Sequence, residues 1–339
     1  MTKRKKKSSK IQAKKSSKLL HYFVWGLAVI ALALSALIAG YYYGYEQAQK
    51  EIVSDIKAEK EKRLQALKKL EELSVKEEKK ETELLRLQKL LKKESAAYTG
   101  ASHEYDDKDI DVAPPKRFER KFTKVSEKPK LAIIIDDVSV RSHIKAIKSL
   151  GIPLTMSFLP PSAQRPNSAK LAANEKFYMV HLPMEAQSFS AEEPNTLRVE
   201  DSQAKISKRI ENLKKLFPRV TYINNHTGSK FTADERAMNH LIYALNKNNI
   251  YFIDSRTTAQ TKAPKVLKNY GLRYLSRDVF LDHKMEKSYV KKQIKKAIEV
   301  AKAHGSAIAI GHPHANTILA LHESKKLLEE VELVYVNKL

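Results

Sequence analysis

The hydrophobic and polar positions of this 339-residue chain follow three successive patterns. Residues 22–45 form an apolar run without a single charged side chain. Residues 46–97 are rich in Glu, Lys, Leu and Ala and contain neither Gly nor Pro, which is the composition of a long helix. From Lys130 onward, short apolar runs alternate with amphipathic stretches of helical period. The pattern therefore predicts an extended helical N-terminal part and a globular C-terminal part.

The apolar run is long enough to cross a membrane, because about 20 apolar residues span the hydrocarbon core of a bilayer. Trp25 lies near one end and Tyr41 to Tyr43 at the other, as in the aromatic belts of membrane interfaces. Residues 1–21 carry nine Lys or Arg and no acid, which predicts a basic tail in the cytoplasm and residues 46–339 outside. We expect a single-pass signal-anchor in the cytoplasmic (inner) membrane. A cleaved signal peptide is the alternative, although its apolar core is usually only about 7–15 residues long.

The charged segment 46–97 has two interpretations. It can be a solvated single-helix spacer held by ion pairs between residues four apart. It can equally be a short coiled coil that joins two copies of the chain into a homodimer, since several apolar residues partly fit a heptad seam. These residues are Ile52, Ile56, Leu64, Leu67, Leu84, Leu87 and Leu91. Residues 98–129, with an acidic run and two adjacent prolines, are predicted to be a linker.

The alternation in residues 130–339 predicts an α/β fold with a parallel sheet or barrel of βα units. The expected strands are residues 131–136, 153–159, 176–182, 220–224, 250–254 and 306–310. The expected helices are residues 142–150, 202–216, 234–248 and 288–304. In the first strand three consecutive Ile precede Asp136 and Asp137. An ordinary core does not place two carboxylates there, because burying an unpaired charge is costly.

Polar side chains suited to metal or proton chemistry follow most of the expected strands. Each has an ordinary structural explanation when taken alone, such as a helix N-cap for Asp136, a turn for Asn225 or an ion pair between Asp254 and Arg256. The carboxyl ends of strands in an α/β barrel share one face, so these side chains are expected to converge into a functional site. The stretches are Asp136-Asp137, His181-Leu182-Pro183-Met184-Glu185, Asn224-Asn225-His226-Thr227-Gly228-Ser229, Asp254-Ser255-Arg256-Thr257, Arg277-Asp278-Val279-Phe280-Leu281-Asp282 and Gly311-His312-Pro313.

The composition limits the chemistry and the partners. The chain contains no Cys, which excludes disulfides, thiolate metal sites and thiol nucleophiles. Its formal net charge of +24 would suit a nucleic-acid partner, but the densest basic cluster borders the apolar run, where membrane topology explains it. We therefore expect no nucleic-acid partner, and any metal must be held by His, Asp or Glu.

The order and spacing of these stretches resemble the polysaccharide deacetylase superfamily, and most closely its divergent branch. The resemblance covers about residues 130–334. It implies a distorted (β/α) barrel of the polysaccharide deacetylase type and the metal-dependent removal of acetyl groups from N-acetylated sugars. By this resemblance Asp136 is the base that activates water, Asp137 and His181 are metal ligands, and His312 protonates the leaving amine. Such a division of work is chemically coherent, since a metal polarises the amide while separate groups accept and donate protons.

The chain departs from the superfamily pattern at one position. Ordinary members carry a second His four residues after the first, where this chain has Glu185. The third ligand is then His226, Glu185 or absent, and we favour His226 because it lies at the end of an expected strand, where Asn225 and Gly228 allow close approach. One Asp and two His suit zinc best, although manganese, cobalt and nickel accept the same ligands. The residues expected to orient ligands or bind substrate are Glu185, Asn225, Asp254, Arg256 and Asp278.

These features together predict a membrane-anchored, metal-dependent hydrolase that removes acetyl groups from a cell-envelope polysaccharide. A non-catalytic glycan-binding or scaffold protein on a degenerate deacetylase fold is the alternative, favoured by the missing second His. A hydrolase of another ester or a phosphoester would use the same residues. Other histidines, such as His143 and His304, are expected to be ordinary helix residues, while His283 and His314 are neighbours of the expected site.

Overall fold

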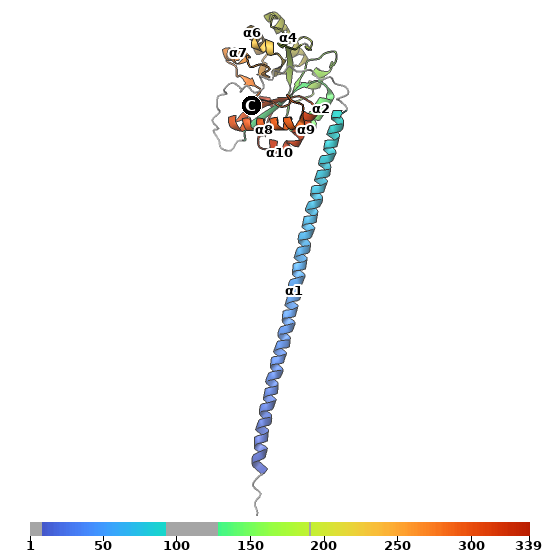
Figure 1. Cartoon of the computed structure of the whole chain (residues 1–339), viewed down its shortest axis with the longest axis vertical. Helices are drawn as coiled ribbons and strands as arrows, with labels where there is room; N and C mark the ends of the chain where they lie inside the picture. The colour runs from blue at the N-terminus through green and yellow to red at the C-terminus, as the bar shows by residue number, and fades with distance from the viewer. Residues whose placement is uncertain (1–8, 93–127, 190) are drawn as a thin grey trace, which may run out of the picture. The chain divides into compact units, whose positions relative to one another are not determined.

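The computed structural model describes residues 9–92, 128–189 and 191–339 (Figure 1). The chain divides into two compact units, Met1–Thr82 and Glu83–Leu339. The start of the predicted basic tail and nearly all of the predicted linker lie outside the described residues. The domain boundaries drawn from the sequence therefore stay predictions.

The first unit is a single long helix, α1 (Ser9–Lys92), which continues past the end of that unit. Its 84 residues extend about 126 Å at the usual rise of a helix. Within it, Lys18–Ala66 contains a stretch long and apolar enough to cross a membrane, judged by length and composition. Large apolar side chains from Leu19 to Tyr45 are exposed. The apolar run and the described part of the charged segment thus form one continuous helix, while the coiled coil stays a prediction.

The second unit is built on a parallel sheet that curls into a half-barrel, as predicted from the alternating pattern. Its strands are β1 (Lys130–Val138), β2 (Thr155–Phe158), β3 (Met179–Met184), β4 (Tyr222–Thr227), β5 (Tyr251–Asp254), β6 (Leu275–Ser276), β7 (Val279–Phe280), β8 (Ser306–Gly311) and β9 (Glu332–Leu333). They follow the order β6-β5-β4-β3-β2-β1-β8-β7, with β9 paired to β1. The path ends at β6 on one side and at β7 on the other, so the barrel is incomplete.

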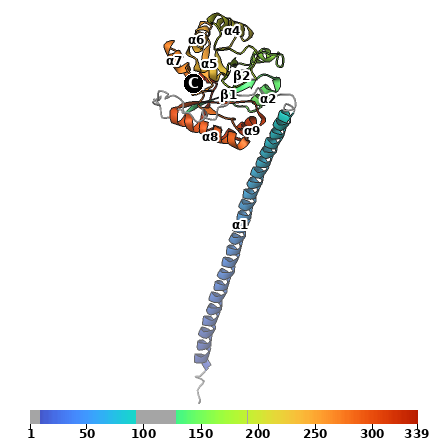
Figure 2. The ribbon, with the colours of Figure 1, turned by 45° about the horizontal axis from the view of Figure 1, so that its top comes forward.

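Helices cover the outside of the sheet, with α8 and α9 on one side and α4, α6 and α7 on the other (Figures 1 and 2). The helices are α2 (Arg141–Ser149), α3 (Ser168–Ala172), α4 (Gln203–Leu216), α5 (Ser229–Ala233), α6 (Glu235–Lys247), α7 (Ala263–Asn269), α8 (Lys287–His304), α9 (Ala315–Glu323) and α10 (Lys325–Leu328), followed by a 3₁₀ turn η1 (Val336–Lys338). Every strand and helix expected in this unit is present, with ends shifted by at most three residues. The elements missed are mostly short ones, for which periodicity carries little signal.

Local capping explains where several of these helices begin and end. Ser202 Oγ accepts a hydrogen bond from the backbone N–H of Lys205 at 3.3 Å, and Asp234 Oδ1 accepts one from Ala237 at 2.8 Å. Both bonds satisfy backbone donors in the first turn of α4 and α6. Gly305 ends α8 with a φ of +79°, a conformation that Gly adopts without steric cost.

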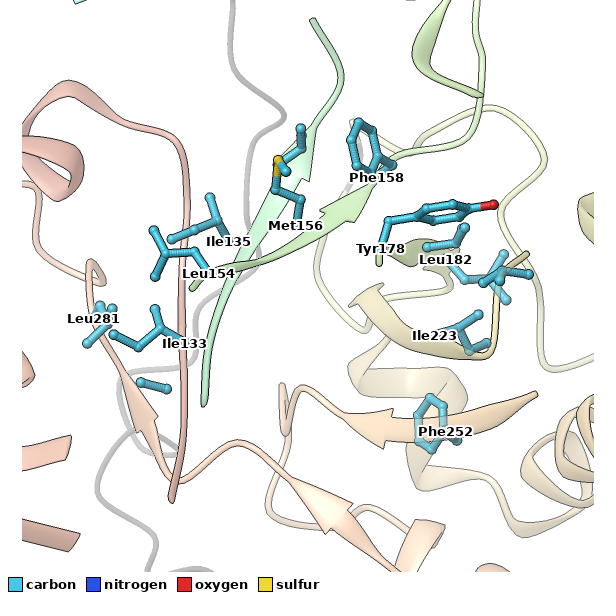
Figure 3. Packing of buried hydrophobic residues seen from close by; sticks show 14 of the residues in the cluster. Ile133, Ile135, Leu154, Met156, Phe158, Tyr178, Leu182, Ile223, Phe252 and Leu281 are labelled. Carbon is cyan, nitrogen blue, oxygen red and sulfur yellow. The ribbon is translucent and has the colours of Figure 1, made fainter. Parts of the chain in front are cut away.

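The core has two layers because side chains alternate between the two faces of each strand. On β1, Ile133 and Ile135 face the helices and pack in one cluster with Leu154 and Leu281 (Figure 3). The alternate residues face the interior of the half-barrel, in a smaller cluster of Ala132, Ile134, Met179, Ile253, Leu275, Ile308, Ile310, Val334 and Val336. The C-terminal segment closes the amino end of the interior, since Val336 N donates to Thr155 Oγ1 at 3.1 Å. The polar interior-facing residues therefore lie at the carboxyl end of the sheet.

Candidate active site

The interior-facing positions of four strands change from apolar to polar at the carboxyl end of the sheet. Side chains two positions apart on a strand share one face. On the interior face, Ile134 is succeeded by Asp136 on β1 and Met179 by His181 on β3. Likewise Ile310 of β8 is succeeded by His312, just past the end of that strand. The parallel register sets His181 of β3 opposite Asn224 of β4, with His226 two residues further along β4. All of these side chains are buried. The sheet itself thus brings together residues that are far apart in sequence.

Asp137, His181 and His226 form a compact group of potential metal ligands. Asp137 Oδ1 lies 3.2 Å from His226 Nδ1 and 3.5 Å from His181 Nε2. One ligand atom of each residue lies within 4.8 Å of the other two, and the two imidazole rings are 5.0 Å apart. The described residues therefore place His226, rather than Glu185, beside Asp137 and His181.

The chemistry of this donor set fits a divalent metal. Burial lowers the pKa of His181 well below its ordinary value, and neighbouring His226 lowers it further. His181 is therefore neutral at neutral pH, so its contacts with Asp136 and Asp137 are not ion pairs. Neutral imidazole and carboxylate are the forms that ligate zinc and similar cations. Asp137, His181 and His226 would hold such an ion, whose identity the donor types leave open.

Strained backbone is concentrated at this end of the sheet. Asp137, Thr227 and Arg256 have φ angles of +55°, +50° and +52°, at or just beyond the carboxyl ends of β1, β4 and β5. Such conformations cost roughly 1–3 kcal/mol each in residues other than Gly and persist only when their surroundings impose them. At Asp137 the left-handed turn of the backbone breaks the strand alternation, so both adjacent carboxylates reach the site.

Asp136 is held by a buried polar network. Its Oδ2 accepts a hydrogen bond from Asn224 Nδ2 at 2.8 Å, while its Oδ1 has no hydrogen-bond partner among the described residues. Asn224 in turn accepts from Ser157 Oγ at 2.6 Å and donates to Ser255 Oγ at 2.9 Å. Burial raises the pKa of Asp136 to about 8, although nearby His312 opposes this effect. A carboxyl group with such a pKa can exchange a proton near neutral pH.

His312 is held by Asp282 on the other side of the interior. His312 Nδ1 lies 3.0 Å from Asp282 Oδ1, and the backbone N–H of His312 donates to Asp282 Oδ2 at 2.6 Å. Thr317 Oγ1 also donates to Asp282 Oδ2 at 2.6 Å. Burial lowers the pKa of His312, but the carboxylates of Asp282, Asp137 and Asp136, with Asp282 the foremost, together raise it more, to about 9. His312 is therefore an imidazolium at neutral pH and can donate a proton.

Three further residues at the site were not singled out in the sequence. Asn224 and Asp282 lie inside the collected stretches, and strand alternation relates Asn224 to His226. His143 was expected to be an ordinary helix residue, yet it is buried and hydrogen-bonded to the backbone of Asp137, with its pKa lowered to about 4 mainly by burial. Only its spacing from Asp137, through a tight turn into α2, could have indicated this. His314 lies within ligand distance of Asp282 and His312.

The other predicted site residues have mainly architectural contacts. Glu185 accepts hydrogen bonds from Lys230 Nζ at 2.6 Å and from the backbone of Val199 at 2.9 Å, so it ties the loop after β3 to α5. Burial raises the pKa of Glu185, but the bonds from Lys230 and Val199 outweigh this effect and lower it overall. Asn225 accepts from the backbone of Ser255 at 2.8 Å and thereby holds the loop after β5.

The remaining three predicted residues also organise loops. Asp254 is fully buried and accepts from the backbone N–H of Arg256 at 2.8 Å, as well as from Thr261 and Tyr274. The carbonyl oxygen of Arg256 accepts from Arg277 Nη2 at 2.8 Å. Asp278 accepts from the backbone of Ile308 at 2.7 Å, which is half-way down β8 and away from the ligand group. These contacts do not show whether the three residues bind substrate, so that role stays a prediction.

Comparison with protein families and relatives gives a consistent result. A model of a family described as divergent polysaccharide deacetylase matches residues 133–339. An uncharacterized protein of Haemophilus influenzae is 36% identical over 215 residues, which cover 62% of this chain and 76% of that protein. The uncharacterized protein YibQ of Escherichia coli is 36% identical over 196 residues, covering 57% of this chain and 61% of the relative.

Solved structures support the fold. The structure of an uncharacterized protein from Agrobacterium tumefaciens superposes with a TM-score of 0.56 at 19% sequence identity. The superposition covers 63% of this chain and 90% of that one. At this level of identity the likeness concerns the arrangement of strands and helices alone.

Proposed function

The chain belongs to the divergent polysaccharide deacetylase family, and on this premise we propose that it is a metal-dependent hydrolase that removes acetyl groups from an N-acetylated cell-envelope polysaccharide. The observation that carries the proposal is the convergence of a potential ligand group, Asp137, His181 and His226, with two proton-transfer groups of shifted pKa, Asp136 and His312. Perturbed titratable groups around potential metal ligands are typical of hydrolytic sites.

The residues divide the reaction between them. When bound by Asp137, His181 and His226, a divalent metal supplies positive charge that polarises the amide carbonyl and lowers the pKa of water. Asp136, oriented by Asn224, takes the proton from the water that attacks the carbonyl carbon. His312, kept protonated by Asp282, gives a proton to the nitrogen as the C–N bond breaks. Acetate and a free amino sugar are the products.

A non-catalytic glycan-binding protein on the same fold is the second candidate. The observation that favours it is Glu185, which replaces the second His of ordinary superfamily members and is engaged by Lys230. If His226 does not replace that ligand, the group at Asp137 retains too few donors to hold a catalytic metal. Metal content therefore separates the two candidates.

The N-terminal unit supports a proposal for the location of the protein. We propose that α1 anchors the protein in the cytoplasmic membrane, with its N-terminus in the cytoplasm and the globular unit outside, where envelope glycan is accessible. A homodimer through residues 46–97 remains an alternative to a single-helix spacer. Nucleic acid is not an expected partner.

The proposed reaction can be tested with the full-length protein purified in detergent with added Zn²⁺. Bound metal is measured by elemental analysis, and acetate release is measured with an N-acetylated chito-oligosaccharide. We expect about one metal per chain and turnover in the wild type. Asp137→Ala and His226→Ala should lose both metal and turnover, because each removes a ligand. Asp136→Asn should keep the metal and lose turnover by roughly 10²–10⁴-fold, the usual contribution of an acid or base.

His304→Ala is the matched control, since His304 is exposed at the end of α8. This variant should keep both metal and turnover. A metal-free wild type without turnover, even in excess Zn²⁺, would contradict the hydrolase and favour the glycan-binding protein. Full turnover by Asp137→Ala would contradict the ligand assignment.

A further inference from the structure

Asp282, His312 and His314 form a second group of potential metal ligands, which shares no residue with the group around Asp137. Asp282 lies two residues beyond β7, His312 directly follows β8, and His314 directly precedes α9. One ligand atom of each residue lies within 4.8 Å of the other two. The carboxyl ends of β7 and β8 thus bring together one carboxylate and two imidazoles, which are donor types that zinc accepts.

Hydrogen bonds hold the carboxylate of this second group against His312. Asp282 Oδ1 lies 3.0 Å from His312 Nδ1, and Asp282 Oδ2 accepts from the backbone of His312 and from Thr317 Oγ1, both at 2.6 Å. The centroids of the His312 and His314 rings are 5.6 Å apart. In the first group the two imidazole rings are 5.0 Å apart. The second pair of imidazoles is therefore spaced much like the first.

Two ligands of the second group are buried and the third is partly exposed. Asp282 and His312 are 2% and 3% exposed, whereas His314 has intermediate exposure. A cation can therefore enter from the side of His314 and meet two buried ligands. Asp282 holds His312 without help from His314, and the His314 side chain makes no capping hydrogen bond to α9. Neither the proposed reaction nor helix capping thus gives His314 a task.

We propose that Asp282, His312 and His314 bind a second divalent cation, such as Zn²⁺, and that this cation inhibits the enzyme. It takes the place of the hydrogen bond between His312 Nδ1 and Asp282 Oδ1, so we expect weaker binding than at Asp137. The second site follows from the ligand group alone, whereas the inhibition rests on the proposed function, in which His312 is the acid. When the cation binds one ring nitrogen, one proton leaves the imidazolium for solvent, and the neutral ligated ring is a much weaker acid.

Titration calorimetry with Zn²⁺ alone as the probe tests the second site. The full-length protein in detergent is first freed of metal with a chelator. We expect two binding events in the wild type, about one Zn²⁺ each, with the second at least about 10-fold weaker and lost on washing. His314→Gln should remove the second event and keep the first, because a neutral amide replaces an imidazole ligand. Asp137→Ala should remove the first event and keep the second.

A second variant and a matched control complete the binding test. Asp282→Asn should also lose the second event alone, so the assignment does not depend on the folding of one variant. His304→Gln makes the same substitution as His314→Gln at an exposed position at the end of α8, and it should keep both events. A single event in the wild type, or an unchanged second event in folded His314→Gln, would overturn the second site.

Inhibition is measured as acetate release from an N-acetylated chito-oligosaccharide over a range of Zn²⁺ concentrations. Wild-type turnover should pass through a maximum and then fall at least about 10-fold as the second site fills, because the acid is lost. His314→Gln, compared with its own maximum, should reach a plateau without this fall. Constant wild-type turnover while the second site fills would overturn the inhibition.

Failure of the second site and failure of the proposed hydrolysis give different results. A second binding event that depends on His314, in a protein without turnover, would support the site and refute the hydrolase alone. Turnover together with a single binding event would refute the second site alone.

Discussion

Asp136 and His312 are buried groups whose surroundings favour the protonated form of each at neutral pH. Burial raises the pKa of Asp136 to about 8. Burial lowers the pKa of His312, but nearby carboxylates, led by Asp282, together raise it to about 9. Asp136 ionises first as pH rises, so between these values the pair holds one base and one acid. Because each affects the charge of the other, the two titrations belong to the pair.

Asp282→Asn should move the alkaline limit of activity. His312 must be protonated to act as the acid, so turnover falls as pH rises through its pKa of about 9. Without the Asp282 carboxylate, burial dominates and the pKa falls, so the alkaline limb of the pH–rate profile should shift down by more than about one unit. The raised pKa also contributes stability that is complete below about pH 6.5, the unfolded value, and is lost as pH rises through about 9.

The pH–rate profile of Asp278→Asn serves as the comparison. Asp278 accepts from the backbone of Ile308, half-way down β8, so its substitution should leave the alkaline limb in place. An unchanged limb in Asp282→Asn would show that His312 is not the acid.

The site depends on a close approach of neighbouring strands, which a residue without a side chain allows. At the end of β4, Gly228 has a φ of +95°, and a Cβ atom there would lie 2.9 Å from Met184 Cβ on β3. Real Cβ atoms essentially never come this close, so Gly228 sets the spacing between the strands that carry His181 and His226. The position therefore links sheet geometry to the potential ligand group.

Gly228→Ala should destabilise the globular unit more than an equivalent change elsewhere. Gly271→Ala is the matched substitution, since Gly271 has a φ of +65° but a Cβ atom added there would meet no other atom within 4 Å. Backbone strain alone should cost about 1–2 kcal/mol at Gly271, whereas the added clash should bring the cost at Gly228 to about 3 kcal/mol or more. Urea unfolding followed by near-ultraviolet circular dichroism measures both. Equal losses would mean that β3 and β4 can separate freely.

At the scale of the whole molecule, the exposed apolar side chains of α1 need a membrane or another cover. In water, exposing a run of this length would be costly at about 25 cal/mol for each Å² of apolar surface. The globular unit buries its own apolar residues in two clusters and does not need that helix to complete its core. The two units therefore differ in how much apolar surface they leave exposed.

Fractionation of cells tests the anchor and its orientation. The full-length chain should stay in the membrane pellet after an alkaline carbonate wash, whereas a chain starting at residue 46 should be soluble. Protease added to spheroplasts should degrade the globular unit, because we expect the basic tail to stay in the cytoplasm and the globular unit to lie outside. A soluble, shortened mature protein would instead indicate a cleaved signal peptide, and protection from the protease would contradict the orientation.

Local signals in the sequence determined the secondary structure and the general place of the site. The Ile133 to Ile135 run predicted β1, Ser202 and Asp234 marked the starts of two helices, and the apolar run predicted the long N-terminal helix. These signals act within a few residues, so they can be read from the sequence without any knowledge of the fold. Polar residues after successive parallel strands share one face, which made the site predictable as a region.

Only the tertiary structure decided which of those polar residues meet. Asp136 and Asn224 are 88 positions apart and touch because of strand order and register. The positive φ of Asp137 turns its carboxylate toward His226, while Lys230 holds Glu185 elsewhere. Shifting the register of a strand by one residue moves each of its side chains to the opposite face of the sheet. Which side chains meet therefore depends on register, bulges and strained turns. Composition and periodicity do not specify the register, the bulges or the strained turns. These are determined by the packing of the whole sheet.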